Sequence, residues 1–518
     1  MEKIATDTYS FADIREGGFV YVDKTAILKP LADGSIGKQF FIARPRRFGK
    51  SLAISTLKCL FEGRRELFKG LAIEPNWDWS KKWPVIHLDM GSCQAESVEE
   101  FRGRVHTMLV KEAIRNKTEL VDDVDVANQF NMLISDLVGK SADGKVVLLV
   151  DEYDKPLLGR LGQANVAEFQ RELKAFYSVV KTCEGQQRFA LMTGVSKFSK
   201  VSIFSDLNNL NEFSMDARVA ELFGYTHEEV KTNFPESLRA FAEKRGKSVD
   251  DAFSLLVRKY DGYRFHPNGA RMFNPVSLGR CLSSRELADY WFETGTPTFL
   301  MKMLAENPMN LDDLEVPASA FSVYEPSAPA MLPILFQTGY LTIESAQETD
   351  EETLYHLRFP NMEVRRGFSA AVSKSFSGVD EVEHASLLNQ MCNALRNDDV
   401  NDMLDALSCF FANIPANITV KREKYYQSLF YAVFVLIGAR IQAECWTNRG
   451  RVDAVVETAN GVFVFEFKLN DTAEAAMRQI GDRGYYEKYL RAGKKLTLVG
   501  VAFDAEMRNL SDRVVAVV

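Results

Sequence analysis

Residues Gln39–Leu57 read QFFIARPRRFGKSLAISTL and predict a strand, a loop and a helix in immediate succession. The stretch opens with the apolar run Phe40–Ala43, which is typical of a buried strand. A basic turn follows and ends in Gly49-Lys50-Ser51. Beyond it, apolar residues recur at the spacing of one helical face, at Leu52, Ile54, Leu57 and Leu60.

The loop in this stretch matches the end of the phosphate-binding pattern GxxxxGK[ST]. In that pattern, backbone N–H groups and a helix N-terminus surround the phosphates, the lysine reaches the terminal phosphates, and the hydroxyl binds Mg²⁺. Arg44 stands at the first glycine of the pattern, where glycine lets the backbone turn tightly under a nucleotide. Because a bare GKS triplet also fits a solvated basic turn, the loop alone leaves both interpretations open.

A second apolar run, Lys145–Val150, ends in Asp151 and Glu152. A run of this kind is typical of a buried parallel strand whose C-terminal end faces a ligand. Asp151 is suited to hold Mg²⁺ through water, and Glu152 is suited to polarise an attacking water. The two acids could instead cap the next helix. Together with the GKS loop, however, they favour nucleotide binding.

A helical pattern over Val166–Thr182 leads to a third strand, Arg188–Thr193, which continues into the polar sequence GVSKFSKVSIF. Thr193 and Ser196 lie where a nucleotide-binding α/β fold carries a polar sensor for the terminal phosphate, although a simple polar loop is the alternative. Strands that alternate with helices and end in polar residues predict a parallel α/β sheet.

The composition limits the function classes. A 518-residue chain with 46% hydrophobic residues is expected to form about three domains with sizeable cores. Its net charge of -8 excludes a global basic field, so any contact with nucleic acid must be local. Seven cysteines without CxxC pairs, no apolar signal core and no apolar run long enough to span a bilayer predict a soluble cytoplasmic protein without membrane contact.

Residues of about 420 to 515 carry a second candidate site. A long apolar helix over Glu423–Ala439 and a short strand over Ile441–Trp446 precede two strands, Arg451–Glu457 and Val462–Lys468. Asn-Gly between these two strands is a strong hairpin signal. A two-residue turn would pair Asp453 with Lys468, and a four-residue turn would pair Asp453 with Glu466. In either register, Asp453, Glu466 and Lys468 share one face because side chains alternate along a strand.

Two neighbouring carboxylates are costly unless a cation lies between them, and their oxygen atoms suit Mg²⁺. Lys468 could then orient an attacking water or stabilise the charge that builds on a phosphate. The alternative is a solvated outer face with a cross-strand ion pair. The opposite face is expected to be buried, since it carries Val452, Ala454, Phe463, Phe465 and Phe467. Spacing alone leaves both interpretations open.

Four motifs in the first three hundred residues, RPRRFGKS, VDEYDKP, TGVSKFSKVSIFSDLNN and YDGYRF, resemble the AAA-ATPase-like family of bacterial proteins. That family is related to the archaeal ATPases within the STAND group of P-loop ATPases, and Arg44 in place of glycine resembles one of its features. The resemblance implies that ATP and Mg²⁺ bind here, with Ser51 and Asp151 on the metal and Glu152 placing water. The nucleotide-binding residues that it implies are Arg44, Arg47, Gly49, Lys50, Ser51, Leu52, Asp151, Thr193 and Arg264.

The C-terminal set resembles the PD-(D/E)XK nuclease superfamily, because Asp453 is followed by Glu466-Phe-Lys468 and by a helix with Gln479. The resemblance implies phosphodiester hydrolysis with Mg²⁺ or Mn²⁺ bound by Asp453 and Glu466, with Lys468 and Gln479 also catalytic. An extra acidic ligand is expected at Glu444 on the preceding strand or at Glu423 at the helix start.

The predicted fold is therefore α/β. We expect a P-loop ATPase domain with a parallel sheet at residues 1–214, a helical lid at 215–316, a winged-helix-like segment at 317–367, a helical spacer at 368–419 and a restriction-endonuclease-like domain at 420–518. An acidic turn, Glu348–Glu352, favours packing over DNA binding by the winged helix.

The expected function is an ATP-regulated nuclease that acts on DNA, or less readily on RNA. One alternative is an ATP-driven switch whose nuclease-like domain only binds nucleic acid or a protein partner. Another is a signalling scaffold that forms homo-oligomers through the lid and the winged helix.

Overall fold

The computed structural model describes most of the chain, and its contacts divide it into two units. The described residues are 2–121, 124–198, 210–291, 300, 303, 311, 314–326, 329–377, 381–412, 429, 432–434, 436–437, 453–458, 460–484, 486–490 and 494–518. The N-terminal unit comprises Met1–Trp291 and Leu314–Met362, and the C-terminal unit comprises Phe292–Asp313 and Glu363–Val518.

Within the described residues, the N-terminal unit is built on a five-stranded parallel sheet in the order β2-β3-β4-β1-β5. Its central strand β4 lies between β1 and β3, so the carboxyl ends of these three strands lie side by side at one edge, where ligands bind in such sheets. The parallel α/β fold class is thus confirmed. The strands are β1 (Gln39–Ala43), β2 (Val85–Asp89), β3 (Val146–Asp151), β4 (Gln187–Gly194) and β5 (Asn211–Glu212).

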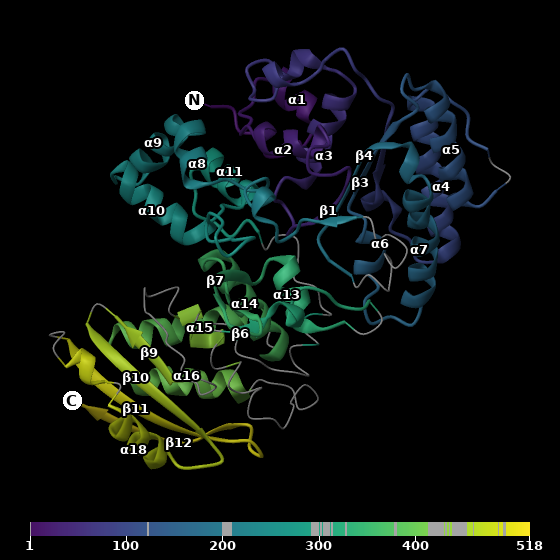
Figure 1. Ribbon diagram of the computed structural model, residues 1–518. Helices are drawn as coiled ribbons and strands as arrows, with labels where there is room; N and C mark the ends of the chain where they lie inside the picture. Colours follow the sequence, from purple (N-terminus) through teal and green to yellow (C-terminus); the bar gives the residue numbers. More distant parts are fainter. Residues whose placement is uncertain are drawn as a thin grey trace. The chain divides into compact units, whose positions relative to one another are not determined.

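Helices cover both faces of this sheet, as expected for apolar strands that are buried from end to end. Figure 1 shows α1, α2 and α3 on one side of β3 and β4, and α4, α5 and α7 on the other. The helix predicted at Val166–Thr182 is present with the same bounds. The helices are α1 (Phe11–Glu16), α2 (Thr25–Ala32), α3 (Lys50–Phe61), α4 (Val98–Arg115), α5 (Val126–Lys140), α6 (Lys155–Leu158) and α7 (Val166–Thr182).

The helical region that follows the sheet has an apolar core of its own, which includes Phe234, Phe241 and Leu256. The start of α2 is fastened to this helical region, because Lys24, which directly precedes α2, forms an ion pair of 2.5 Å with Glu229. The helices are α8 (His227–Asn233), α9 (Pro235–Lys244), α10 (Val249–Tyr260) and α11 (Pro275–Ser284).

The last part of the N-terminal unit, where the sequence predicts a winged-helix-like segment, contains a helix and a β-hairpin. Helix α13 (Met331–Thr338) lies in the chain between β6 and β7 of a sheet in which the described strands are ordered β6-β8-β7 and are antiparallel. Phe321, Ile343 and Leu357 form its core. The strands are β6 (Leu314–Pro317), β7 (Thr342–Glu348) and β8 (Thr353–Arg358). Their identity as a winged helix stays a prediction.

In the C-terminal unit, helices lead to a sheet whose described strands are ordered β12-β11-β10-β9. Strands β10 and β11 are parallel, and α18 connects them. The helices are α14 (Met362–Ser377), α15 (Glu381–Arg396), α16 (Val400–Ala412) and α18 (Ala473–Arg483), and the strands are β9 (Asp453–Glu457), β10 (Gly461–Leu469), β11 (Lys495–Asp504) and β12 (Asn509–Val517). Across the described parts of both units, no helix combines the length and the apolar character needed to cross a bilayer.

Candidate active sites

The loop between β1 and α3 forms a tight turn at the carboxyl edge of the sheet. Gly49 precedes the first residue of α3 with φ 91°, a left-handed conformation that glycine adopts without strain. Arg47 is also left-handed, with φ 67°, and its guanidinium donates to Tyr290 O at 2.5 Å. Ser51 and Leu52 follow in the first turn of α3, whose N-terminus is a ready site for anions.

Lys50 is buried inside its own loop. Its Nζ donates hydrogen bonds of 2.9 Å to Arg44 O and to Pro45 O. Burial lowers the pKa of Lys50, while the nearby carboxylates of Asp151 and Asp154 act in the opposite direction. The ammonium group therefore lies close to the acids that follow β3, as a lysine that reaches nucleotide phosphates should.

Arg44, which replaces the first glycine of the pattern, is 1% exposed and directs its side chain away from the loop. Its guanidinium donates to Ser214 O at 2.6 Å and to Val219 O at 3.2 Å, and it lies over the ring of Phe265. Burial lowers its pKa to about 9. These contacts give Arg44 a structural role in holding the segment after β5, and its contact with a nucleotide stays a prediction.

The structure brings Asp151 and Thr193 together at the ends of β3 and β4. Thr193 Oγ1 donates to Asp151 Oδ1 at 2.7 Å, and the backbone N–H of Glu152 donates to the same oxygen at 2.9 Å. Glu152 has φ 50°, a strained backbone conformation of the kind that clusters at functional sites. Its carboxylate lies 3.4 Å from the ammonium of Lys155.

A third acid, Asp89, joins this group and was given no role in the sequence analysis. Asp89 ends β2 directly beside Asp151 in the strand register. A Cβ atom on Gly91 would lie 2.5 Å from Glu152 Oε2 and 2.9 Å from Asp89 Oδ1, so the two carboxylates converge over this glycine. Burial raises the pKa of Asp89, and the charges of Asp151 and Glu152 add to the effect. The sequence did contain a signal for Asp89, because an acid at the end of an apolar strand, as at Asp151, is typical of this site.

The loop after β4 is held from two sides. Asp154 is buried and accepts the backbone N–H groups of Val195, at 3.1 Å, and of Ser196. Tyr324 OH donates to Ser196 Oγ at 2.9 Å from the last part of the unit. Burial raises the pKa of Asp154 to about 6. Ser196 is thus packed between other groups, whereas Thr193 makes the contact to Asp151.

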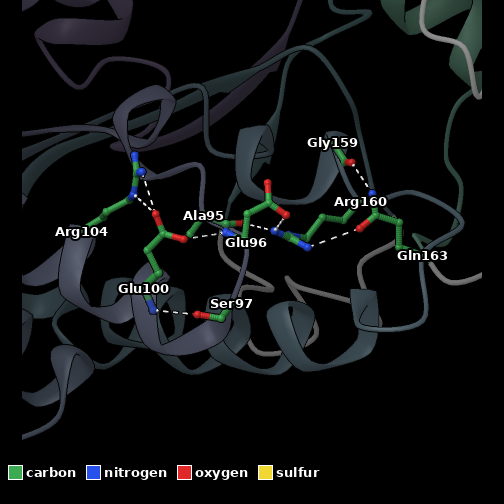
Figure 2. Close-up of polar contacts among 8 residues, drawn as sticks. All are labelled: Ala95, Glu96, Ser97, Glu100, Arg104, Gly159, Arg160 and Gln163. Carbon is green, nitrogen blue, oxygen red and sulfur yellow. Dashed lines mark hydrogen bonds and ion pairs between the residues drawn. The ribbon is translucent and has the colours of Figure 1, made fainter.

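A buried arginine ties the segment after β3, which carries Glu152, to the segment that follows Asp89 at the end of β2. Figure 2 shows Arg160 donating to Ala95 O and to Gln163 Oε1, the latter at 3.3 Å. The Glu96 carboxylate lies 3.5 Å from the same guanidinium. In the same view, Glu100 accepts the backbone N–H of Glu96 at 2.8 Å, which fixes the start of α4.

Arg264, predicted to touch phosphate, lies against the sheet β6-β8-β7 instead of the acids that follow β3. Its Nη1 donates to Glu344 O at 2.6 Å, and its backbone N–H donates to Thr342 Oγ1 at 2.7 Å. It lines one small cavity together with Arg44 and Pro45. A phosphate contact of Arg264 stays a prediction.

The sequence allows two connections for the hairpin of the C-terminal unit, and the structure has the four-residue one. Glu457 pairs with Val462, and therefore Asp453 pairs with Glu466. Thr458 explains this choice: its Oγ1 accepts the N–H of Gly461 at 3.0 Å, and its own N–H donates to Gly461 O at 2.8 Å.

Glu466, Lys468 and Gln479 form one cluster. Lys468 Nζ donates to Glu466 Oε1 at 3.3 Å and also to Gln479 Oε1, which α18 brings over the sheet. Asp453 of β9 is the register partner of Glu466. Glu444 and Glu423, the suggested additional ligands, lie outside the described residues.

The alternative of a solvated outer face is wrong for Glu466, which is 1% exposed. Strand β10 is central in its sheet, and both faces are covered, since Val462 and Val464 are as buried as Phe463 and Phe465. Val462 and Val464 share a core with Ile480 of α18. The face that carries the acid is therefore buried beneath a helix.

The environment of Glu466 fits a cation. Its Oε2 atom is buried and has no hydrogen-bond partner among the described residues. An unpaired buried carboxylate oxygen is costly, and a hard divalent cation would satisfy it. Asp453 is the register partner of Glu466 on β9, and its place as the second acidic ligand stays a prediction.

Comparisons with known proteins identify the families of the two parts of the chain that carry these sites. The model of a family described as predicted AAA-ATPase matches residues 5–204, and that of the PD-(D/E)XK nuclease superfamily matches residues 421–513. The chain is also 35% identical, over 529 aligned residues and 98% of each chain, to a protein of Azotobacter chroococcum mcd 1 described as an uncharacterized protein in vnfD 5'region. The chain thus belongs to the predicted AAA-ATPase family and carries a C-terminal domain of the PD-(D/E)XK nuclease superfamily.

Proposed function

We propose that the protein is an ATPase that regulates its own C-terminal, metal-dependent nuclease, which hydrolyses phosphodiester bonds of DNA or RNA. The observation that carries the proposal is the cluster of Glu466, Lys468 and Gln479, in which a buried acid keeps one oxygen without a partner among the described residues. Such an arrangement is costly for folding alone and suits metal-dependent chemistry.

In the nuclease site, Glu466 and Asp453 would hold the metal. A bound Mg²⁺ or Mn²⁺ supplies a Lewis acid for the phosphate and a water of lowered pKa. Lys468 would stabilise the charge that builds on the phosphate oxygens. Gln479 would hold Lys468 in place through the hydrogen bond that Lys468 donates to it.

In the ATPase site, the loop N–H groups and Lys50 would bind the phosphates, with Ser51 and Asp151 serving the Mg²⁺ ion that such families use. Glu152 would orient the attacking water, and Asp89 would limit the space open to the Glu152 carboxylate beside Gly91. Lys50 would exchange its bonds to Arg44 O and Pro45 O for phosphate oxygens.

Contacts of the phosphate loop support the regulatory part of the proposal. A Cβ atom on Gly339, at the end of α13, would lie 2.7 Å from Pro45 Cβ, so α13 ends directly against the loop. A displacement of Pro45 on nucleotide binding would therefore move the end of α13 and with it strand β7, which begins three residues after Gly339.

The motif YDGYRF supports the same coupling at the end of the N-terminal unit. A Cβ atom on Gly262, which has φ +101°, would overlap Pro360 O. Asn361 Nδ2 also donates to Asp261 O at 2.8 Å. The N-terminal unit ends at Met362. The motif therefore contacts the last residues of this unit, Pro360 and Asn361, directly before the chain continues into the C-terminal unit.

The test is cleavage of single- and double-stranded DNA and RNA by the full-length protein with Mg²⁺ or Mn²⁺. We expect cleavage by the wild type and its loss in Glu466→Gln, with ATP binding retained in both. Equal cleavage by the two proteins would refute the assignment of the nuclease site.

The second candidate function is an ATP-driven switch whose nuclease-like domain only binds nucleic acid or a protein. It keeps the nucleotide-binding residues of the first site and needs no metal at Asp453 and Glu466. Titration of the full-length protein with Mn²⁺ distinguishes the two functions, because the switch would leave Glu466→Gln and the wild type alike.

A further inference from the structure

Gly500 of β11 lies beside Glu466 in the sheet. The two residues are register partners in parallel strands, so they occupy equivalent places under α18. The backbone of Gly500 does not have a positive φ, unlike the glycines of the turns. Conformational freedom is therefore not what requires glycine here.

Space requires it. A Cβ atom on Gly500 would lie 2.5 Å from Ala473 O, 2.7 Å from Met477 Cγ and 3.0 Å from Met477 N. Two of these three atoms belong to the backbone of the first helical turns, and they cannot swing aside as the end of a side chain can. Glycine within a strand often marks such a close approach of another backbone. Helix α18 thus rests directly on β11 at this point.

The same helix completes the cluster around Glu466. Gln479 lies two residues beyond Met477, and its Oε1 accepts the hydrogen bond from Lys468. Lys468 in turn donates to Glu466. The height of α18 above the sheet therefore decides whether Gln479 reaches Lys468.

We propose that Gly500 is a positioning residue of the nuclease site, which sets the distance of α18 from the sheet and thereby the place of Lys468 relative to Glu466. The inference rests on the proposed nuclease function. An added methyl group would lift the helix by on the order of 1 Å, and a misplacement of this size costs about 100-fold in rate. The loss should appear in kcat, with KM for the nucleic acid little changed.

The matched control lies on the same helix. Gly481 also lacks a positive φ, and a Cβ atom on it would meet no described atom within 4 Å. Gly481→Ala therefore adds the same methyl group to α18 without lifting it. We expect this variant to cleave as the wild type does.

The experiment is a kinetic double-mutant cycle in the full-length protein, with Gly500→Ala, Gln479→Ala and the double variant. If Gly500 acts through Gln479 and Lys468, the double variant should lose little more than the stronger single variant. Independent, multiplicative losses would overturn the inference, as would unchanged kcat in a folded Gly500→Ala protein. ATP hydrolysis should be unchanged in all variants.

A second route to the same displacement covers the case in which Gly500→Ala fails to fold. Ala476 of α18 is fully buried, and Ala476→Val would raise the helix from its own side. It should give the same loss of kcat, again without added loss in the Gln479→Ala background. If the wild type cleaves no nucleic acid with either metal, the proposed function itself is wrong. If the wild type cleaves, and Gly500→Ala and Ala476→Val cleave equally well, only this inference is wrong.

Discussion

The ammonium group of Lys50 donates a 2.9 Å hydrogen bond to the carbonyl oxygen of Pro45, inside the loop that is proposed to bind phosphate. Pro45 also supports the end of α13 at Gly339. A nucleotide that draws Lys50 away from Pro45 would therefore act on the contact between the phosphate loop and the last part of the N-terminal unit.

Lys50→Ala should lower ATP affinity at least tenfold, because it removes a buried ammonium group that lies close to the acids following β3. The measurement is thermal unfolding with and without ATP and Mg²⁺, since a ligand at about 100 times its Kd stabilises by about 2.7 kcal/mol. Lys58→Ala, on the same helix, is the control and should keep the full shift. An equal shift in Lys50→Ala would contradict the assignment.

Gly91→Ala should slow ATP hydrolysis about tenfold or more while leaving ATP binding intact. Its methyl group would displace the Glu152 carboxylate, which lies 2.5 Å from the Cβ position. Steady-state hydrolysis and nucleotide titration separate the two effects. Gly103→Ala is the control, because a Cβ atom there meets no described atom within 4 Å. Wild-type hydrolysis by Gly91→Ala would remove Glu152 from the catalytic set.

Asp154 should make the stability of the N-terminal unit depend on pH. Burial raises its pKa from 3.8 to about 6, so the folded state binds a proton more tightly than the unfolded chain does. The resulting stability is fully present below about pH 4 and is lost as the pH rises to about 6. Relative to Asp154→Asn, the wild-type free energy of unfolding should fall by on the order of 2–3 kcal/mol across this window. The measurement is urea unfolding of both proteins at each pH. If their free energies of unfolding change with pH in parallel, this prediction is wrong.

Gly262→Ala should uncouple the two activities, because its methyl group cannot coexist with Pro360 O. We expect each activity to survive in part and the effect of ATP on cleavage to disappear. Gly246→Ala is a strict control, since Gly246 is also left-handed, with φ +58°, but has no described neighbour within 4 Å of its Cβ position. An ATP effect of equal size in the two variants would show that the motif YDGYRF does not couple the activities.

Glu466→Gln should abolish metal binding in the C-terminal unit. In the wild type, Mn²⁺ should satisfy the buried Oε2 atom and raise the unfolding temperature, and a chelator should reverse the effect. In the variant, a neutral amide replaces the carboxylate, so neither Mn²⁺ nor the chelator should change the unfolding temperature. Calorimetric titration with Mn²⁺ provides the check, and comparable affinities would be evidence against the site.

The sequence predicts those parts of the structure that local patterns encode. Continuous apolar runs identified β1, β3 and β4 as buried parallel strands, because such strands are covered on both faces. The spacing of Asp453, Glu466 and Lys468 identified their shared face. Which of two registers the hairpin adopts could not be predicted, because it depends on the hydrogen bonds of Thr458.

Residues that act through tertiary contact were missed. Gly91 and Gly500 have no local signature, since the atoms that exclude a side chain at each belong to residues distant in the sequence or on another element. The direction of the Arg44 side chain was equally hidden, because it depends on carbonyl groups more than 150 residues away, at Ser214 and Val219. The possibility of a solvated face at Glu466 failed because α18 covers it.

The most direct test of the account is the rate of nucleic acid cleavage as a function of ATP concentration for the wild type, Lys50→Ala and Asp453→Ala. We predict that ATP changes the rate of the wild type, that Lys50→Ala cleaves at a rate independent of ATP, and that Asp453→Ala does not cleave but still binds ATP. Cleavage by Asp453→Ala at the wild-type rate, or an unaltered ATP response in Lys50→Ala, would contradict the account.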